Sequence, residues 1–239
     1  MALSPRTLDS LVSYWTDRLG VDDDAFDREA VTVGPANEGG IQLFRRGEAL
    51  VVGAPESRVA AVRERLSDCD STIVTEGEAL RRRFESLGTV TAVFDSTFYG
   101  YADEESFAPV LSDARLLTVD DHAAYERLRT TVPDEEWSNG GSQFEIGTTV
   151  GLFDGDELVA TAGYEVWDDF LAHIAVVVHP NQRGNGYGRE VVSEVTEQVL
   201  GDGLLPQYRT ADEWPWSVAL AESLGFERFV TAALVQLEL

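Results

Sequence analysis

The sequence predicts an α/β fold built on a mixed sheet, and two patterns carry this prediction. In the middle of the chain, strand-like stretches rich in apolar residues follow one another at 148–153, 157–166 and 171–178. Beyond them, helices are expected at 189–200 and 216–224, and strands at 204–210 and 229–237. A block of strands followed by β-α-β-α-β alternation is typical of a mixed α/β (α+β) sheet.

The N-terminal part of the chain predicts a separate, smaller α+β unit. Its expected helices are 6–19, 56–66 and 76–87, and its expected strands are 31–33, 41–44, 49–52 and 90–94. Residues 95–112 follow no regular pattern, so we predict an irregular segment there that joins two domains, 1–112 and 113–239. The second domain should open with a short strand at 116–117 and a helix ending near residue 130, followed by a loop at 134–141.

Charge is the strongest feature of the composition. The chain has 43 acidic residues against 18 basic ones, a formal net charge of −25, and every basic residue is an arginine. Nucleic acid and anionic membranes both need a positive surface, so neither is expected as a partner. Dense carboxylates without lysine suit high salt, where screening relieves their repulsion, and we predict a halophilic protein. The start of the chain lacks a signal-peptide profile, which favours a cytoplasmic location.

A glycine-rich turn, His179–Gly188, is the stretch from which a function can be inferred. It follows the apolar run 174–178 and leads into the helix expected at 189–200. Its glycines, Gly184, Gly186 and Gly188, let the backbone approach a ligand closely. The unpaired N–H groups and the positive dipole end of a helix N-terminus suit a phosphate. Strand, glycine turn and helix together predict a cradle for a pyrophosphate.

The order of motifs around this turn resembles one enzyme family. Arg183-x-x-Gly186-x-Gly188 follows a Val-Val-Val-His-Pro strand and precedes a helix, a strand and Ala219-Leu-Ala-Glu-Ser-Leu-Gly-Phe226. This order resembles the GNAT superfamily of acetyl-CoA-dependent N-acyltransferases, over roughly residues 113–239. It implies a GNAT-like acyl-CoA N-acyltransferase fold preceded by a smaller α+β domain, for which we expect a role in acceptor binding or dimerisation.

The resemblance also implies which residues hold acetyl-CoA as co-substrate. In the family, the loop matching Arg183–Gly188 wraps the pyrophosphate with backbone amides, and the strand matching 176–178 bonds the pantetheine arm through its main chain. Arg183 and Arg189 would add positive charge, Tyr187 would pack beside the cofactor, and Ser217 matches a serine found in some subfamilies. The expected cofactor-binding residues are Val176, Val177, Val178, Arg183, Gly184, Asn185, Gly186, Tyr187, Gly188, Arg189 and Ser217.

The catalytic residues are less well marked, because the chain departs from the family at two positions. Many members carry Asn where this chain has Trp214, and a proton-donating Tyr where it has Ala221. Attack by an amine on a thioester needs a base, an oxyanion donor and a proton for the thiolate. The donor is expected to be a backbone N–H of the strand 176–178. Candidate bases are His173, Glu165 and Glu145, and Tyr208 is the candidate acid.

These observations predict an N-acetyltransferase that moves an acetyl group directly to an amine of a small molecule or peptide. Alternatives are a longer acyl-CoA as donor, an acetyl-CoA-binding regulatory protein with decayed catalysis, and a binding module whose N-terminal domain recruits a macromolecule. A homodimer is compatible with the prediction. No metal site is expected from the spacing of His, Asp and Glu residues, and the single cysteine, Cys69, excludes an internal disulfide.

Overall fold

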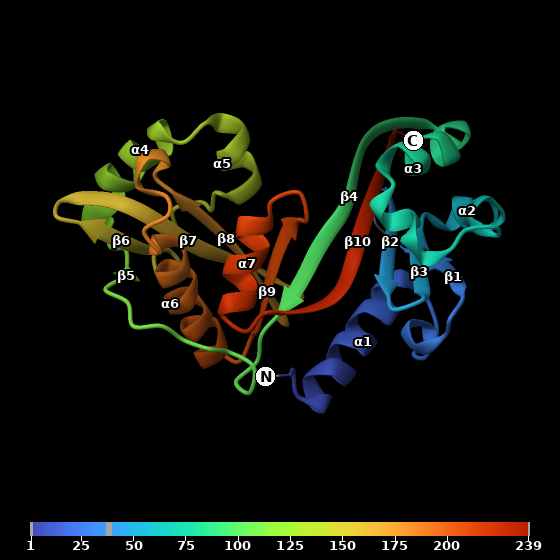
Figure 1. The fold of residues 1–239 in the computed structure, drawn as a ribbon, viewed down its shortest axis with the longest axis horizontal. Coiled ribbons are helices and arrows are strands. Elements are labelled where there is room, and N and C mark those ends of the chain that lie inside the picture. The colour runs from blue at the N-terminus through green and yellow to red at the C-terminus, as the bar shows by residue number, and fades with distance from the viewer. Residues whose placement is uncertain (1, 37–39, 239) are drawn as a thin grey trace. The chain divides into compact units, whose positions relative to one another are not determined.

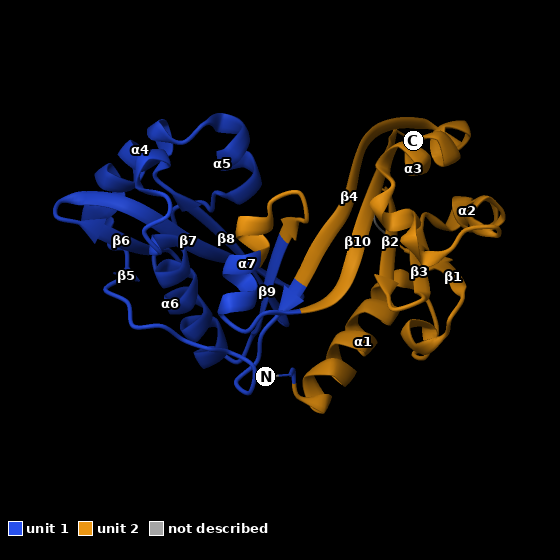
Figure 2. Cartoon of the chain, viewed as in Figure 1, with its two compact units in different colours: residues 1–3, 100–209, 219–227 blue, residues 4–99, 210–218, 228–239 orange. Residues whose placement is uncertain are grey.

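The structure is a computed structural model that describes residues 2–36 and 40–238, and the chain divides into two compact units (Figure 2). Unit 1 comprises Met1–Leu3, Gly100–Arg209 and Ala219–Glu227. Unit 2 comprises Ser4–Tyr99, Thr210–Val218 and Arg228–Leu239. Each unit therefore takes residues from three stretches of the chain, and the C-terminal strand lies with unit 2. Neither unit is a single stretch that begins or ends at residue 112. The division into the domains 1–112 and 113–239 stays a prediction.

Unit 2 holds a sheet in the strand order β1-β3-β2-β10-β4. Its strands are β1 (Val31–Pro35), β2 (Gly40–Arg46), β3 (Ala49–Ala54), β4 (Thr89–Tyr101) and β10 (Glu227–Glu238). The last two residues of β4 and the first residue of β10 are counted with unit 1. Its helices are α1 (Pro5–Leu19), α2 (Val59–Leu66) and α3 (Gly77–Phe84). Strands β1 and β3 pair in parallel, whereas β2 pairs antiparallel with β3 and β10.

The local sequence explains why α1 begins and ends where it does. Ser4 accepts a hydrogen bond from the N–H of Thr7, and Gly20 ends the helix with a φ of 62°. Trp15, buried on the apolar side of the helix, packs edge-on against the ring of Phe44, with centroids 4.8 Å apart. The helix predicted at 6–19 is confirmed.

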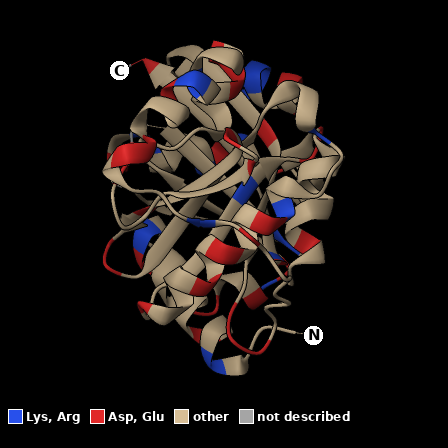
Figure 3. Cartoon of the chain, turned by 90° about the vertical axis from the view of Figure 1, so that its left-hand side faces the viewer, with Lys and Arg blue, Asp and Glu red and all other residues tan. Residues whose placement is uncertain are grey.

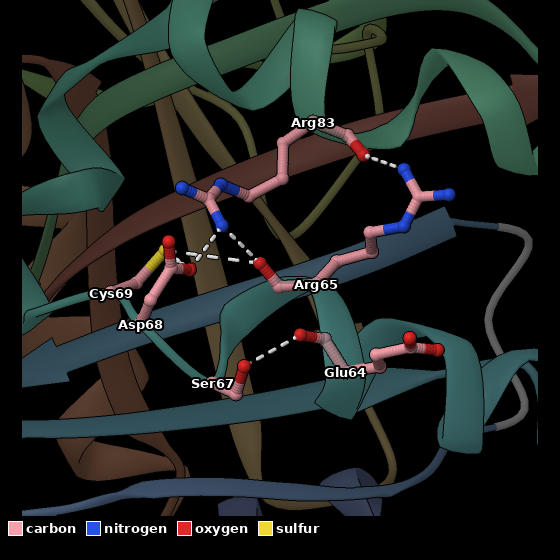
Figure 4. A network of polar contacts seen from close by, with 6 residues as sticks. All are labelled: Glu64, Arg65, Ser67, Asp68, Cys69 and Arg83. Carbon is pink, nitrogen blue, oxygen red and sulfur yellow. Dashed lines mark hydrogen bonds and ion pairs between the residues drawn. The ribbon is translucent and has the colours of Figure 1, made fainter.

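A polar network joins α2 to the end of α3 (Figure 4). Arg65 donates to the backbone carbonyl of Arg83 at 3.1 Å, and Arg83 donates to the carbonyl of Arg65 and, at 2.6 Å, to Asp68. The Arg83 guanidinium lowers the pKa of Asp68 below its usual range. Burial raises the pKa of the neighbouring Cys69 thiol, which keeps it protonated and poorly nucleophilic. The network is structural.

Unit 1 holds a second run of strands in the order β9-β8-β7-β6-β5. The strands are β5 (Arg115–Leu116), β6 (Val150–Asp154), β7 (Glu157–Trp167), β8 (Leu171–Val178) and β9 (Leu205–Ala211). The helices are α4 (His122–Thr131), α5 (Asp134–Gly140), α6 (Tyr187–Gly201) and α7 (Pro215–Ser223), whose first residues are counted with unit 2. Strands β8 and β9 are parallel, while β6, β7 and β8 are antiparallel neighbours, so the mixed α/β sheet is confirmed.

Helices cover both faces of these strands (Figure 1). On one face, α4 packs Tyr125 and Leu128 onto Leu158 and Val177, and Ser142, which follows α5, lies over Gly163. On the other face lies α6, after which Asp202 accepts a hydrogen bond from Tyr164 at 3.0 Å. Because side chains alternate along a strand, odd-numbered residues near the middle of β7 face α4 and α5, and Tyr164 faces α6.

Two predicted segments were wrong. Residues 134–141, expected as a loop, contain α5, whose first turn carries Asp134, Glu135 and Glu136, acidic residues that suit the positive end of a helix. The first part of 95–112, expected to be irregular, continues β4 to Tyr101. There, Ser96 adopts a φ of 43°, and this interruption disturbs the two-residue alternation by which a strand is recognised.

The surface is strongly acidic in the part of the chain that the structure describes. In Figure 3, acidic residues are spread over the elements in view, with arginines between them. The predicted adaptation to high salt is compatible with this distribution and stays a prediction. Among the described helices, none is long and apolar enough to cross a membrane.

Candidate active site

The glycine turn joins β8 to α6 as predicted. Gly184 and Gly186 adopt φ angles of 83° and 89°, in the left-handed region that glycine tolerates best, and Gly186 is the N-cap of α6. A Cβ built on either glycine would meet no atom within 4 Å, so both lie on an open side of the loop. Gly188 differs, because its Cβ would lie 3.2 Å from Val178 and 3.1 Å from Leu220. The first two glycines expose the backbone, and the third allows close packing of the helix.

Backbone N–H groups line this turn without acceptors. In residues 2–36 and 40–238, no hydrogen bond is donated by the N–H of any residue from Arg183 to Gly188. By contrast, the N–H groups of Arg189 and Glu190 are bonded to the carbonyl of Gly186, at 2.9 and 3.2 Å. The unpaired donors stand at the N-terminus of α6, where the helix dipole is positive. The turn has the donors and the polarity of an anion site.

Next to this turn, the edge of strand β8 has no strand partner in the part of the chain that the structure describes. It pairs with β9 only from Leu171 to Ile174, although both strands continue further. The N–H of His179 donates to Val159 at 2.8 Å, and hydrogen-bonded pairs alternate along an antiparallel ladder. The main-chain groups of Val176 and Val178 therefore point away from β7, to the side that β9 has left. The side chain of Val177, by contrast, is buried in the core beneath α4.

The arginines of the loop have protein partners. Arg183 forms an ion pair with Glu136 of α5, and both side chains are partly exposed to solvent. Arg189 donates to the carbonyl of Ser223 at the end of α7, at 3.1 Å. Asn185 bonds Gln182 within the loop, and the side chain of Tyr187 is half-buried at the start of α6. Arg183 thus brings a positive charge to the turn itself, and Glu136 competes for it.

This competition leads to a prediction about cofactor affinity. On the sequence-based prediction that the turn holds acetyl-CoA, Glu136→Gln removes the ion pair and should tighten binding by up to about fivefold, because exposed ion pairs contribute about 0.2–1 kcal/mol. Arg183→Ala should weaken binding. Isothermal titration calorimetry at constant salt measures both.

The matched control is Glu135→Gln, which makes the same charge change at the neighbouring, exposed position of α5. Its affinity should stay at the wild-type value. An equal gain in Glu135→Gln and Glu136→Gln would contradict a role for the ion pair and indicate a general effect of negative charge.

Two of the four candidate catalytic residues come together. Glu165 and His173 are directly opposite in the β7–β8 ladder and so share a face of the sheet. Between them lies Trp167, whose ring centroid is 5.1 Å from that of His173 and whose Nε1–H donates to Glu165 at 3.3 Å. Burial, and then the charge of Arg209, lower the pKa of His173 to about 3. The imidazole is therefore neutral at physiological pH, and its pKa lies well below the near-neutral value that suits a general base.

The predicted acid lies on the opposite face. Tyr208 is the register partner of Ile174, the neighbour of His173, so it points to the other side of the sheet. It is buried there, with its ring centroid 5.7 Å from that of Phe226. The structure does not bring Tyr208 together with His173 and Glu165. Glu145 precedes β6, where its backbone N–H donates to the hydroxyl of Thr149 at 2.9 Å.

The two positions at which this chain departs from the family lie in different surroundings. Ala221, in the second half of α7, is fully buried, and no side chain at that position offers a phenol. Trp214, which stands before α7, and Ser217, in its first turn, belong to the residues counted with unit 2. The assignment of Ser217 to the cofactor stays a prediction.

One polar residue of this region was missed in the sequence. Gln207 of β9 is fully buried and is the register partner of His173 on the parallel strand. Its Nε2 donates to the hydroxyl of Tyr101 at 2.6 Å. A single glutamine within an apolar strand does not by itself indicate a functional residue. Its position beside His173 becomes visible only when the register of β8 and β9 is known.

The comparisons with known proteins agree with this geometry. Residues 114–226 match the model of the Acetyltransferase (GNAT) family. A GNAT-family acetyltransferase from Colwellia psychrerythraea is 11% identical over 99% of this chain and 98% of its own, with a TM-score of 0.54. An X-ray structure of a Drosophila protein is 16% identical over 99% and 97% of the two chains, with a TM-score of 0.51. No curated protein matches the sequence.

The fold and the family match define the class: this protein is an acyltransferase. Residues 114–226 form a GNAT acetyltransferase domain, and the two full-length likenesses show that the fold extends over nearly the whole chain. At these identities the structural likenesses speak for the fold alone. Among the residues that the structure describes, no group of three His, Cys, Asp or Glu side chains could hold a metal ion.

Proposed function

We propose that this protein is an N-acetyltransferase that moves the acetyl group of acetyl-CoA directly to an amine of a small molecule or peptide. The observation that carries the proposal is the run of unpaired N–H groups from Arg183 to Gly188, next to the edge of β8 beyond its pairing with β9. An anion-binding turn alone would suit many nucleotides. Joined to a strand edge with free main-chain groups, it suits a ligand that has a pyrophosphate and a long amide-bearing arm.

Each part of this region then has a task. The amides of the turn would hold the pyrophosphate, with Arg183 adding charge, and the main chain of Val176 and Val178 would bond the arm. The arm would lead the thioester towards Ile174, the last β8 residue paired with β9. A backbone N–H of this strand edge would stabilise the developing oxyanion.

The reaction releases one proton overall. An acceptor that arrives as an ammonium ion loses a proton to become nucleophilic, attacks the thioester carbon and loses a second one as the amide forms. The C–S bond breaks, and the thiolate takes up one proton. Glu165 and His173 are the residues proposed to handle the amine protons, because they share the face of the sheet at this point.

A regulatory protein that binds acetyl-CoA without turning it over is the second candidate. The buried Ala221 favours it, because the proton donor of many family members is missing there. Tyr208 does not compensate on the face of Glu165 and His173, since it points to the other side of the sheet.

Binding and turnover separate the two candidates. Affinity for acetyl-CoA is measured by calorimetry, and release of free thiol is measured against a panel of primary amines, amino acids and peptides in high salt. Thiol release stimulated at least tenfold by one class of amine supports the enzyme. Tight binding with no stimulation by any acceptor supports the regulatory protein, and absence of binding contradicts both. We also propose a cytoplasmic location, a halophilic character and a homodimer. The binding and turnover measurements do not depend on these three proposals.

A further inference from the structure

Two buried polar atoms on neighbouring strands of unit 1 lack partners. In the described part of the chain, Nδ1 of His173 and Oε1 of Gln207 are inaccessible to solvent and have no hydrogen-bond partner. The two residues are directly opposite in the parallel β8–β9 pairing, so their side chains leave the same face of the sheet side by side. Unpaired buried polar atoms are rare and call for an explanation.

One hydrogen bond would satisfy both atoms. A neutral imidazole has a proton on one nitrogen, and an amide oxygen accepts. Gln207 is already held from behind, because its Nε2 donates to the hydroxyl of Tyr101 at 2.6 Å, which directs Oε1 away from Tyr101. A rotation of the imidazole about its side-chain bonds can bring Nδ1–H to this oxygen, because paired strands lie only about 4.8 Å apart.

We propose that Gln207 is a positioning residue that fixes His173 as the Nδ1–H tautomer and so turns Nε2 to the acceptor amine. The inference rests on the proposed function, since it names the arrangement that makes His173 useful in acetyl transfer. Tyr101, Gln207 and His173 then form a chain of hydrogen bonds that runs from the core to the site. Gln207 acts through His173 and does not touch the substrate.

The charged groups around His173 fit this arrangement. Glu165 of β7 is opposite His173 in the β7–β8 ladder and is exposed to solvent. Its carboxylate can attract an ammonium ion. Arg209 of β9 lies over the ring of Trp167, at 5.4 Å, and its charge opposes an imidazolium. An Nδ1–H···Oε1 bond favours the imidazolium and therefore offsets part of the effect of Arg209 and burial. In the transfer step, Nε2 accepts a proton from the amine as the C–N bond forms, and the departing thiolate takes a proton from solvent.

The tautomer can be measured on the full-length protein without acetyl-CoA or an acceptor. The chain has only three histidines, so nitrogen-15 NMR resolves each imidazole, and the signals lost in His173→Gln identify His173. The proposal expects a protonated Nδ1 and an unprotonated Nε2 near neutral pH. A protonated Nε2 with an unprotonated Nδ1 in the wild type would overturn it.

Variants of Gln207 give a second readout. Gln207→Glu should raise the pKa of His173 by about 1–2 units, because a carboxylate favours the imidazolium more than an amide does. Gln207→Leu should lower the fraction of the Nδ1–H tautomer and, with any acceptor from the amine panel, lower kcat at least tenfold with little change in KM for acetyl-CoA. An unchanged pKa in Gln207→Glu contradicts the proposal.

Matched controls separate positioning from folding. Gln198→Leu removes another glutamine whose Oε1 is buried and unpaired, on α6, and should leave the His173 signals unchanged. If the Gln207 variants do not fold, Tyr101→Phe tests the same series of hydrogen bonds. The fraction of His173 in the Nδ1–H tautomer should fall in this variant too. Because the NMR readout needs no turnover, a protein with the expected tautomer but no acyl transfer would refute the proposed function and leave the His173–Gln207 bond standing.

Discussion

Gly186→Val is expected to abolish measurable acetyl-CoA binding. At a φ of 89°, a β-branched residue is strained, and its side chain would project into the open side of the turn, where Cβ meets no protein atom. A ligand held by the amides of this turn would meet the side chain instead. Loss of two hydrogen bonds to a charged group, at about 1.5–3 kcal/mol each, corresponds to at least about 100-fold in affinity. Calorimetry with acetyl-CoA and with CoA checks this.

The control for backbone strain is Gly203→Val. Gly203 has a φ of 76°, its Cβ would also meet nothing within 4 Å, and it follows α6 at the helix end remote from the turn. Both variants should lose similar stability, about 1–2 kcal/mol for the left-handed backbone. Only Gly186→Val should lose affinity. Unchanged affinity in Gly186→Val would refute the assignment of the cradle.

Gly225→Ala is expected to have the second large effect, on stability. A Cβ on Gly225 would lie 2.0 Å from the carbonyl oxygen of Ser106 and 3.2 Å from the nitrogen of Ala108, both of them backbone atoms of a buried or partly buried segment. Its φ of 86° adds strain. Left-handed strain and forced backbone movement together should cost about 2–5 kcal/mol of the free energy of unfolding. Denaturant unfolding followed by tryptophan fluorescence measures the loss.

Gly203→Ala serves as the comparison, since it has a similar φ and no neighbour within 4 Å. It should lose only the cost of the left-handed backbone. If Gly225→Ala proves no less stable than Gly203→Ala, the close approach of Ser106 is not a constraint. In that case the glycine of the Leu-Gly-Phe motif would serve only to end α7.

The strand–turn–helix order around the glycines was predictable because its physics is local. The order of strand, glycine turn and helix could be recognised in 179–188, and the φ angles of Gly184 and Gly186 show why glycine is needed. The proton chemistry was not predictable in the same way. His173 and Glu165 are eight residues apart in the sequence, and only the β7–β8 register shows that they are opposite each other, whereas Tyr208 points to the other face.

The sequence by itself determined the mixed α/β class, the position of the glycine turn and the family resemblance, because each depends on residue types and short spacings. The tertiary structure alone decided which distant residues meet: Glu136 with Arg183, Ser106 with Gly225, and Gln207 with His173. The physical reason is that strand alternation determines which side chains share a face of one strand but leaves open which residue of the next strand lies opposite. The hydrogen-bonded pairing of strands and the packing of helices on them determine which residues lie opposite each other. These contacts determine which side chains surround the glycine turn.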